Sequence, residues 1–480
     1  MPPCRLSPLT LVSTPLQKVC AMQNINPPRS WQDQDMMAYL GREAPRYTSY
    51  PSAHHFTSLE PETYAGWLRT LPRDQSIGLY VHIPFCEQMC WFCGCNTQIT
   101  HRAEPVEAYV ACLIEEIAMV GRELAFRPSV HALHFGGGSP GILSPAAMTR
   151  VFEALTRSFE LKPDAEVSIE LDPRQITNEK LKTYTDLGFN RVSLGVQDTQ
   201  PQVQAAINRH QPFAVIAQSV AALREHGLTS IGVDLLYGLP HQTADSLAAT
   251  LNDIIRLDPD RISAFSYAHV PWMKKHQQLI DTAALPDIHE KVLQYLQIDT
   301  QLRATGYDAV GIDHFAKTSD GLAVAARNGT LRRNFMGYTD LPNDRQIAFG
   351  ASSISQLDDG IAQNIPQSTS YQRLIKEGRL PTVRGWAYQS DDKVRGAVIS
   401  DLMCRFECNV AEVLHRHGYA VDYLDQDIQR LADFVAAGIV TIDERLVRFE
   451  SPMKMLVRSV ACVFDTYAEG EGGNRYSKVA

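Results

Sequence analysis

The chain has 480 residues, 44% of them hydrophobic and 21% charged, and its formal net charge at pH 7 is -9. A chain of this length can bury a large core and can hold more than one domain. Its negative balance gives no whole-chain attraction to nucleic acid or to an anionic membrane, and no run of 18 apolar residues predicts a membrane span. We therefore expect a globular cytoplasmic protein without nucleic-acid or membrane partners, in which an anionic ligand must meet a local cluster of cations.

The first segment, residues 1–44, is rich in Pro, Ser, Thr and Gln, and its apolar stretch Leu9–Val12 is too short for the core of a secretion signal. We expect these residues to form a flexible tail ahead of the first domain; a true start at Met22, Met36 or Met37 would explain them equally well.

Strand and helix patterns then alternate along the chain. Six short apolar segments are typical of buried strands: Gly78–Phe85, Val130–Gly136, Glu166–Leu171, Arg191–Val196, Ser230–Leu236 and Arg261–Tyr267. Helical patterns separate them, at Glu104–Leu124, Ser144–Phe159, Asn178–Leu187, Phe213–His226 and Thr243–Leu257. Ser144 and Thr177 stand where N-caps belong, and Gly188 and Gly227 stand where helices end. Repeated βα units favour parallel strands with right-handed crossovers, so this α/β pattern predicts a partial or full barrel.

The pattern after the sixth strand is less regular. Residues 287–305, 308–315 and 346–357 could extend or close the sheet, so we assign residues 45–389 to a barrel domain with extensions. Residues 390–480 read as a mostly helical C-terminal domain, with helical runs at 393–405, 410–417, 427–437 and 452–467 and a hairpin at 439–449. Helices with a hairpin also suggest a winged helix, but no basic stripe accompanies them, which favours a role in covering the substrate or in packing.

Four of the ten cysteines lie between Cys86 and Cys95, directly after the first predicted strand. Ten cysteines are too few for a disulfide-built fold, and their clustering indicates a metal. Structural zinc normally takes four ligands, usually as two separated pairs, and no second pair follows at a suitable distance. The loop at the carboxyl end of a barrel strand is also where catalytic groups gather.

The spacing of Cys86, Cys90 and Cys93 fits a 4Fe-4S cluster held by three thiolates, which leaves one iron without a protein ligand. An amino acid can chelate that iron, which would place the sulfonium of S-adenosylmethionine (SAM) beside an electron source able to cleave it to methionine and a 5'-deoxyadenosyl radical. Cys95 lies only two residues after Cys93, which makes ligation of the same cluster by both cramped, so we expect Cys95 to lie nearby without ligating.

Several longer stretches resemble one family, the oxygen-independent coproporphyrinogen III oxidases of the radical SAM superfamily. They are PRYTSYP from Pro45, LYVHIPFCEQMCWFCGCN, HFGGGSP, SIELDPR, FNRVSLGVQD, INRHQ, DLLYGLP and FSYAHVP. The resemblance implies decarboxylation of two propionates of coproporphyrinogen III to vinyl groups, giving protoporphyrinogen IX in heme biosynthesis without O2. It further implies a partial (β/α)6 radical SAM barrel and two SAM molecules at one site.

The same resemblance gives roles to individual residues. Besides the three cluster ligands, the positions that match SAM contacts are Tyr80, Phe92, Gly137, Gly138, Ser139, Glu170, Gln197, Arg209, Asp234, Ala268 and Ile354. The residues alone also allow blander readings: aromatic or apolar core for Tyr80, Phe92, Ala268 and Ile354, and an ordinary tight turn for the glycines. Glu170 and Asp234 lie in apolar strands, where a buried carboxylate needs a donor, and Arg209 offers a planar fork that suits a carboxylate. Ser139 stands where the family usually has Thr, which keeps the hydroxyl.

The sequence indicates the substrate contacts less clearly than the cluster and SAM contacts. An acidic protein must meet four substrate carboxylates with focused positive charge, and Arg332, Arg333, His314 and Lys317 are candidates, although a solvated surface loop is the ordinary reading of such a run. We expect a monomer that uses a separate electron donor and a separate electron acceptor.

Three other functions compete with this reading. Related radical-SAM-like proteins act as heme chaperones and decarboxylate nothing, but they generally lack the cysteine that matches Cys95 and the RYTSYP segment, both present here. Another radical SAM reaction on a tetrapyrrole would keep the cluster and change the substrate pocket. A zinc-stabilised binding module would be colourless, whereas an iron–sulfur protein is brown.

Overall fold

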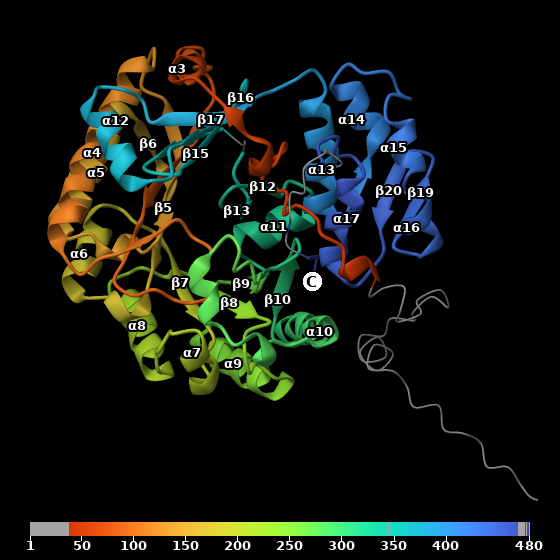
Figure 1. The fold of residues 1–480 in the computed structure, drawn as a ribbon, viewed down its shortest axis with the longest axis horizontal. Helices are drawn as coiled ribbons and strands as arrows, with labels where there is room; N and C mark the ends of the chain where they lie inside the picture. Colours follow the sequence, from red (N-terminus) through yellow and green to blue (C-terminus); the bar gives the residue numbers. More distant parts are fainter. Residues whose placement is uncertain (1–37, 343–344, 469–475, 477, 480) are drawn as a thin grey trace, which may run out of the picture.

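A single large sheet forms the core of the protein, whose computed structural model describes residues 38–342, 345–468, 476 and 478–479. The six predicted barrel strands make up its centre: β2 (Ile77–Ile83), β5 (Ser129–Gly137), β6 (Glu160–Leu171), β7 (Arg191–Gln197), β8 (Ser230–Tyr237) and β9 (Arg261–Ser266). They are adjacent in that order and parallel throughout. The predicted partial (β/α)6 barrel is therefore confirmed (Figure 1).

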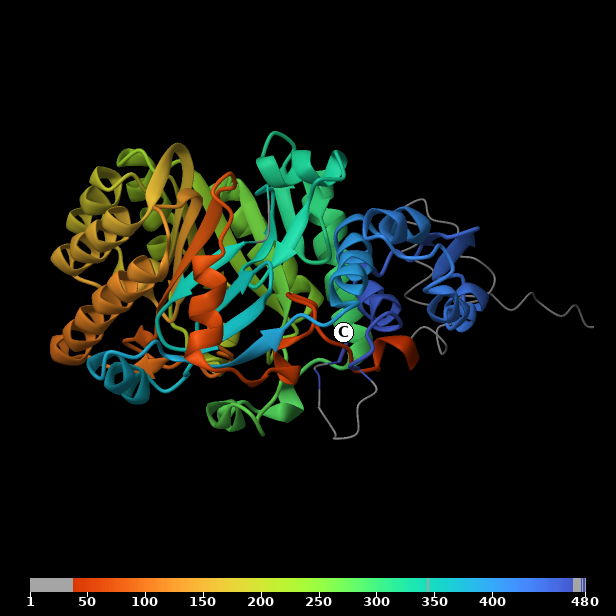
Figure 2. The same ribbon diagram turned by 90° about the horizontal axis from the view of Figure 1, so that it is seen from above.

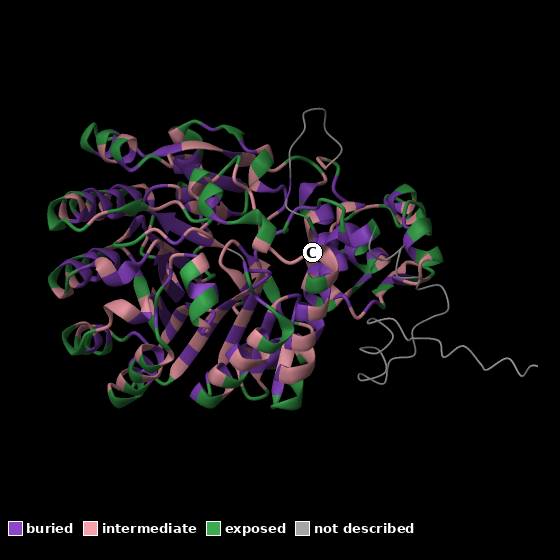
Figure 3. Ribbon diagram, turned by 60° about the horizontal axis from the view of Figure 1, so that its bottom comes forward, coloured by how far each residue is buried: buried purple, intermediate pink, exposed green. Residues whose placement is uncertain are grey.

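The predicted helices lie outside this sheet and turn their buried faces toward it (Figure 3). They are α4 (Ala103–Glu123), α5 (Pro145–Ser158), α6 (Asn178–Asp186), α8 (Phe213–Glu225) and α9 (Ala244–Leu257). The Ser144 and Thr177 side chains cap α5 and α6 by accepting backbone N–H groups, as predicted. Gly188 and Gly227 follow helices at φ of +84° and +83°. The helices α3 (Pro61–Arg69), α7 (Pro201–Ala206), α11 (Gly321–Arg327) and α12 (Ser368–Lys376) were not predicted.

Further strands extend the sheet at both edges. Beyond β2 come β14 (Gln346–Phe349), β15 (Ile354–Leu357), β16 (Gly360–Asn364), β17 (Thr382–Ala387) and β1 (Thr57–Ser58). Beyond β9 come β11 (His314–Lys317) and β10 (Tyr307–Val310), which follow helix α10 (Ile288–Ala304). Strand order runs from β1 to β10 without joining them, so these segments extend the sheet and do not close it. Between β11 and β14 the chain forms a separate hairpin of β12 (Arg332–Asn334) and β13 (Gly337–Thr339).

The C-terminal part packs beside the sheet (Figure 2). It contains α13 (Asp392–Arg405), α14 (Val410–Arg416) and the predicted hairpin, β19 (Val440–Asp443) with β20 (Leu446–Phe449), to which β18 (Glu407–Asn409) adds an unpredicted third strand. The predicted helix at 427–437 is two short helices, α15 (Asp425–Gln429) and α16 (Ala432–Ala436). The predicted helix at 452–467 is shorter, because only η6 (Lys454–Leu456) and α17 (Val457–Cys462) are helical. In the described residues no helix is long and apolar enough to cross a membrane.

Both ends of the described chain meet at α17. Tyr39 and Leu40 are buried, so the last residues of the expected tail are packed, while residues 1–37 lie outside the described part. The buried guanidinium of Arg458 donates to the carbonyls of Ala44 and Pro45 on one side and of Lys478 and Val479 on the other. This arrangement fixes the start of the PRYTSYP segment against the C-terminal part.

A buried carboxylate fixes the turn between β14 and β15. Glu116 of α4 accepts hydrogen bonds from Gly350 N at 2.7 Å, from Asn364 Nδ2 at 2.6 Å and from the Tyr371 hydroxyl at 2.6 Å. Burial raises the pKa of Glu116 from 4.5 to about 7, against the lowering effect of these three hydrogen bonds. Ionisation of the Glu116 carboxyl group therefore lowers the stability of the folded state.

This cost predicts a pH dependence of stability. The folded protein holds the Glu116 proton more tightly than the unfolded chain does, so the stability that protonation gives below pH 4.5 is lost as the pH rises through about 7. Each unit of pKa shift corresponds to roughly 1.4 kcal/mol. The melting temperature of the wild-type protein should fall between pH 5 and pH 7.5 more steeply than that of Glu116→Gln. Equal slopes for the two proteins would contradict this assignment.

Candidate active site

The cysteine loop begins at the carboxyl end of β2 and forms one wall of a cavity of about 560 Å³. Its two ends are joined by the short parallel strands β3 (Phe85–Cys86) and β4 (Gln98–Ile99). Asn208 Nδ2 donates to Met89 O at 2.8 Å, which holds the middle of the loop against the segment after α7. The predicted site residues that line this cavity are Cys86, Cys90, Phe92, Cys93, Gly137, Gly138, Ser139, Glu170, Gln197 and Arg209. The fold thus brings most of the predicted site together.

Each of the three predicted cluster ligands receives a hydrogen bond at sulfur. Thr97 Oγ1 lies 3.2 Å from Cys86 Sγ, Arg209 Nη1 lies 3.3 Å from Cys90 Sγ, and the Cys95 backbone N–H donates to Cys93 Sγ at 3.4 Å. Hydrogen bonds to thiolate sulfur are characteristic of iron–sulfur sites, where they tune the cluster. In the described part of the chain no three Cys, His, Asp or Glu side chains converge on a point that suits a single metal ion. Thiols spread over one cavity wall suit a four-iron cube better, so the residues fit the predicted cluster.

Cys95 lines the same cavity and is exposed to it. Its thiol hydrogen-bonds to Cys93, and this bond is the main cause that lowers the pKa of the Cys93 thiol. The structure therefore places Cys95 beside a predicted ligand, as expected from its spacing.

The glycine-rich turn after β5 packs tightly against the start of the cysteine loop. A Cβ atom on Gly137, whose φ is +114°, would lie 2.6 Å from the ring of His82. One on Gly138 would lie 2.6 Å from Phe85 O. The next residue, Ser139, is buried and donates from its hydroxyl to Gln175 Oε1 at 2.7 Å. Close packing inside the protein is thus sufficient to require glycine at both positions. The predicted approach of a ligand is a second reason for glycine there.

Glu170 joins this turn to the interior of the barrel. Its Oε2 accepts the Gly137 N–H at 3.2 Å, and its Oε1 lies 3.2 Å from His134 Nε2. Burial acts to raise the pKa of Glu170, but the hydrogen bond and charge of His134 outweigh it and lower the pKa below its usual range. Tyr80 stacks on His134 with ring centroids 5.9 Å apart, which places it beside this carboxylate but behind the cavity wall.

Arg209 connects the cluster loop to β6 and β7. It donates to Cys90 Sγ and to Gly195 O, and it forms an ion pair with Asp172 at 3.4 Å. Within the described part of the chain its buried Nε has no hydrogen-bond partner, so one edge of the fork is left for a ligand. Gln197, the last residue of β7, adopts a left-handed conformation at φ +70° and faces the same cavity.

Three predicted contacts lie further from the cysteine loop. Asp234 of β8 accepts a hydrogen bond from Ser193 Oγ at 2.9 Å, and burial, followed by the charge of Glu170, raises its pKa. Ala268 follows β9 and shares Gln277 with the cysteine loop, because Gln277 Nε2 donates to Phe92 O at 3.0 Å and to Ala268 O at 3.4 Å. Ile354 begins β15, directly after the turn that Glu116 holds. None of the three lines the 560 Å³ cavity.

No role was predicted for Asp172 and Arg174, at the end of the SIELDPR stretch, or for Gln175 directly after it. Asp172, Arg174 and Gln175 all line the cavity, and Arg174 forms an ion pair with Asp172 at 2.6 Å. Burial acts to raise the pKa of Asp172, and the charges of Arg174 and Arg209 keep it below its usual range. Their position directly after a barrel strand was the signal that would have found them.

The four candidate substrate contacts separate in the structure. Lys317 forms ion pairs with Asp258 at 3.0 Å and Asp260 at 3.4 Å, and Arg332 is exposed on β12. Arg333 and His314 instead lie close to each other through Tyr338, whose ring centroid is 4.4 Å from Arg333 Cζ and 5.3 Å from the His314 ring.

Comparisons with known proteins agree with this geometry. The model of the radical SAM superfamily matches residues 80–254. The oxygen-independent coproporphyrinogen III oxidase of Bradyrhizobium diazoefficiens is 41% identical over 437 residues, which cover 91% of this chain and 97% of that protein. The enzyme of the same name from Escherichia coli K12 is 38% identical over 426 residues, covering 88% and 93%. A solved structure of Escherichia coli coproporphyrinogen III oxidase, described as a radical SAM enzyme, superimposes with a TM-score of 0.85 at 36% identity and covers 91% of this chain and 99% of that one.

The different roles predicted for the Cys93 and Cys95 thiols can be tested by measuring the iron content of variants. We expect Cys93→Ser to lose most of the iron and the brown absorption of anaerobically reconstituted protein, because a three-thiolate site cannot spare a ligand. Cys95→Ser should keep both, since its sulfur only hydrogen-bonds to Cys93. Equal loss of iron in the two variants would make Cys95 a fourth ligand.

Proposed function

The chain belongs to the family of oxygen-independent coproporphyrinogen III oxidases, and we propose that it converts two propionate side chains of coproporphyrinogen III to vinyl groups, giving protoporphyrinogen IX in heme biosynthesis without O2. The observation that carries this proposal is the set of three thiols on one wall of a cavity whose other walls carry Glu170, Gln197 and Arg209.

The protein's own residues prepare the site in three ways. Cys86, Cys90 and Cys93 would hold the 4Fe-4S cluster, and the donors at each sulfur would stabilise its negative charge. When bound, the reduced cluster supplies the electron that cleaves SAM and so produces the radical that abstracts hydrogen from a propionate. Arg209 Nε, which has no hydrogen-bond partner in the described part of the chain, offers a donor to a carboxylate. Each propionate then loses CO2 and leaves one electron for an acceptor.

We further propose that two SAM molecules bind. The predicted contacts fall into two groups: seven line the 560 Å³ cavity, whereas Tyr80, Asp234, Ala268 and Ile354 do not. Gln277 ties the second group to the first through Phe92, so two adjacent sites fit this arrangement. We also propose that the protein is a monomer served by a separate electron donor and a separate electron acceptor.

The proposed function is tested by measuring the turnover of coproporphyrinogen III. Anaerobically reconstituted protein with SAM, a reductant, an electron acceptor and coproporphyrinogen III should yield 5'-deoxyadenosine and protoporphyrinogen IX. Deoxyadenosine without the vinyl product would keep radical cleavage and point to another tetrapyrrole reaction. Tight heme binding without deoxyadenosine formation would identify a heme chaperone.

The number of SAM molecules is tested by binding. Equilibrium dialysis of the cluster-loaded protein with labelled SAM should give two SAM per chain, because the two groups of contacts occupy separate walls. A stoichiometry of one would reject the second site and leave the first intact.

A further inference from the structure

Four cations from distant parts of the sequence approach one another beside the barrel. They are Arg46 of the PRYTSYP segment, Lys291 of α10, Arg333 of β12 and Arg458 of α17. Burial, followed by the charges of Arg46 and Arg333, lowers the pKa of Arg458 to about 9. Burial, followed by the charges of Lys478 and Arg46, lowers the pKa of Lys291 to about 8. We call these four residues the cation cluster.

A single carboxylate faces both Arg46 and Arg333 across the cluster, and it is already engaged. Asp313 Oδ1 lies 2.7 Å from His314 Nδ1. Burial acts to raise the pKa of Asp313, but His314, Arg333 and Arg46 outweigh it and lower the pKa to about 2. Positive charge therefore exceeds negative charge among these residues, and excess charge in an enclosed place is costly unless an anion accompanies it.

The four cations differ in how many of their hydrogen-bond donors have partners within the protein. Arg458 donates to backbone carbonyls, and Lys291 Nζ donates to Tyr267 O at 3.1 Å. Arg333 stacks on Tyr338, and its buried Nε and Nη1 have no hydrogen-bond partner within the described part of the chain. Arg46 makes one long contact, from Nη2 to Ser266 O at 3.4 Å. Arg46 and Arg333 therefore have donors left over.

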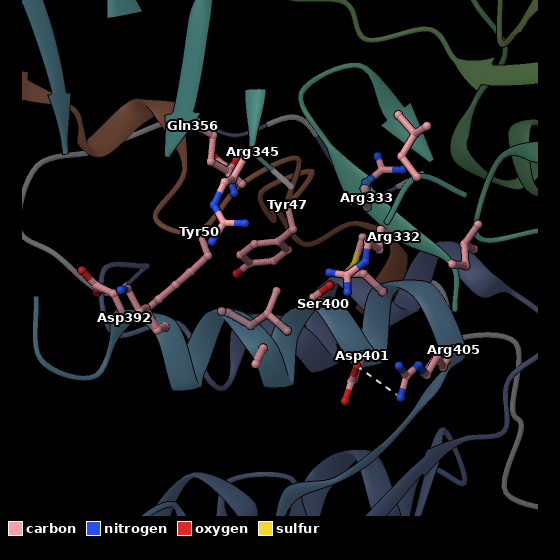
Figure 4. A pocket seen from close by; sticks show the side chains of 18 of the residues that line it. Tyr47, Tyr50, Arg332, Arg333, Arg345, Gln356, Asp392, Ser400, Asp401 and Arg405 are labelled. Atoms are coloured by element: carbon pink, nitrogen blue, oxygen red, sulfur yellow. Dashed lines mark ion pairs between the residues drawn. The ribbon is translucent and has the colours of Figure 1, made fainter. Parts of the chain in front are cut away.

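Arg46 is both exposed and partly surrounded by protein. Its side chain is accessible to water, yet enough protein surrounds it that burial lowers the pKa of its guanidinium. Arg333 lines a cavity of about 690 Å³. Figure 4 shows this cavity between the segment that carries Tyr47 and Tyr50, the strand that carries Arg332 and Arg333, and helix α13. A ligand can thus reach the guanidinium of Arg333 from this cavity.

The cation cluster adjoins the predicted SAM contacts. His314 of β11 pairs in register with Ser263 of β9, and Ser263 pairs in register with Asp234 of β8. The charge of His314 acts on Asp234, and the Phe265 ring meets the His314 ring edge-on with centroids 5.5 Å apart. Only one strand, β9, therefore separates His314 from Asp234.

We propose that Arg46 and Arg333 form a subsite for one propionate carboxylate of the substrate, and that Arg458 and Lys291 shape it from behind. This inference rests on the proposed function. Two planar guanidinium groups suit a carboxylate because each offers a fork of donors to its two oxygens. Of the other two candidates, Lys317 is paired with two aspartates, whereas Arg332 is exposed and lines the same cavity as Arg333.

The experiment compares variants of the reconstituted, cluster-loaded protein. Arg333→Met and Arg46→Met should each raise the KM for coproporphyrinogen III about 10-fold to 100-fold, the effect of losing a hydrogen-bonded charge pair. Arg333→Lys should give an intermediate KM, because it keeps the charge and loses the fork. Arg327→Met is the matched control, since this nearby arginine of α11 (Gly321–Arg327) is exposed and pairs with Asp308 on the surface. It should behave as the wild type.

Readouts other than turnover separate this subsite from a structural role. Iron content, SAM binding and the melting temperature of the Arg333→Met protein should match the wild type, because a guanidinium held for a ligand gives little stability to the free protein. Lower melting temperature or iron content at unchanged KM would show a structural role and overturn the proposal. A raised KM for SAM in place of the porphyrinogen would overturn it too, by assigning the anion to SAM.

The proposed function can fail separately. If the wild-type protein makes no protoporphyrinogen IX, the substrate assignment is lost, and with it this subsite. If the wild type turns over and both methionine variants keep its KM, only the subsite is rejected.

Discussion

Close packing around His82 is the constraint on which the site depends. Gly137 on one side and Gly350 on the other each leave no room for a Cβ, which would lie 2.6 Å from the His82 ring and from His82 O. The ring also lies 3.1 Å from the Tyr80 hydroxyl and 3.0 Å from Asn96 O, where the cysteine loop ends. The end of β2 therefore sets the positions of the glycine turn, the cysteine loop and the β14–β15 turn together. Because interiors are close-packed, a shift in any one of them would be felt by the others.

Electrostatics inside the barrel divides the site into two regions of opposite character. Around the cysteines, Arg174 and Arg209 are offset by Asp172, with which both pair, and by Glu170, so the protein supplies donors there without excess positive charge. Around Asp313 the cations outnumber the carboxylate, and Arg333 keeps unpaired donors. The first region suits a cluster and a zwitterionic cosubstrate, and the second suits an anionic substrate. An acidic protein can bind such a substrate because its positive charge is concentrated at one place.

The sequence could predict those parts of the site that lie in continuous segments. The cysteine loop, the glycine turn and Glu170 each follow or end a barrel strand, and parallel strands bring their carboxyl ends together without further information. Arg46, Lys291 and Arg458 could not be found in this way, because each lies in a pattern that reads as ordinary surface and only tertiary packing joins them. Glu116 was missed for the same reason: it is one acidic residue of an amphipathic helix until the turn at Gly350 meets it. The short C-terminal helices show that apolar periodicity does not fix where a helix breaks.

The C-terminal part of the chain contributes to the site by positioning Arg46. Arg458 belongs to that part, and it holds Ala44 and Pro45, the residues immediately before Arg46. Tyr47 continues the contact by donating to Asp465 at 3.0 Å. The position of Arg46 is therefore set by residues more than four hundred positions later, whereas the cysteine loop is held by Asn208, Gln277 and Pro366, which belong to the barrel and its extensions. Cluster binding thus needs the barrel, and an assembled cation cluster needs both ends of the chain packed onto it.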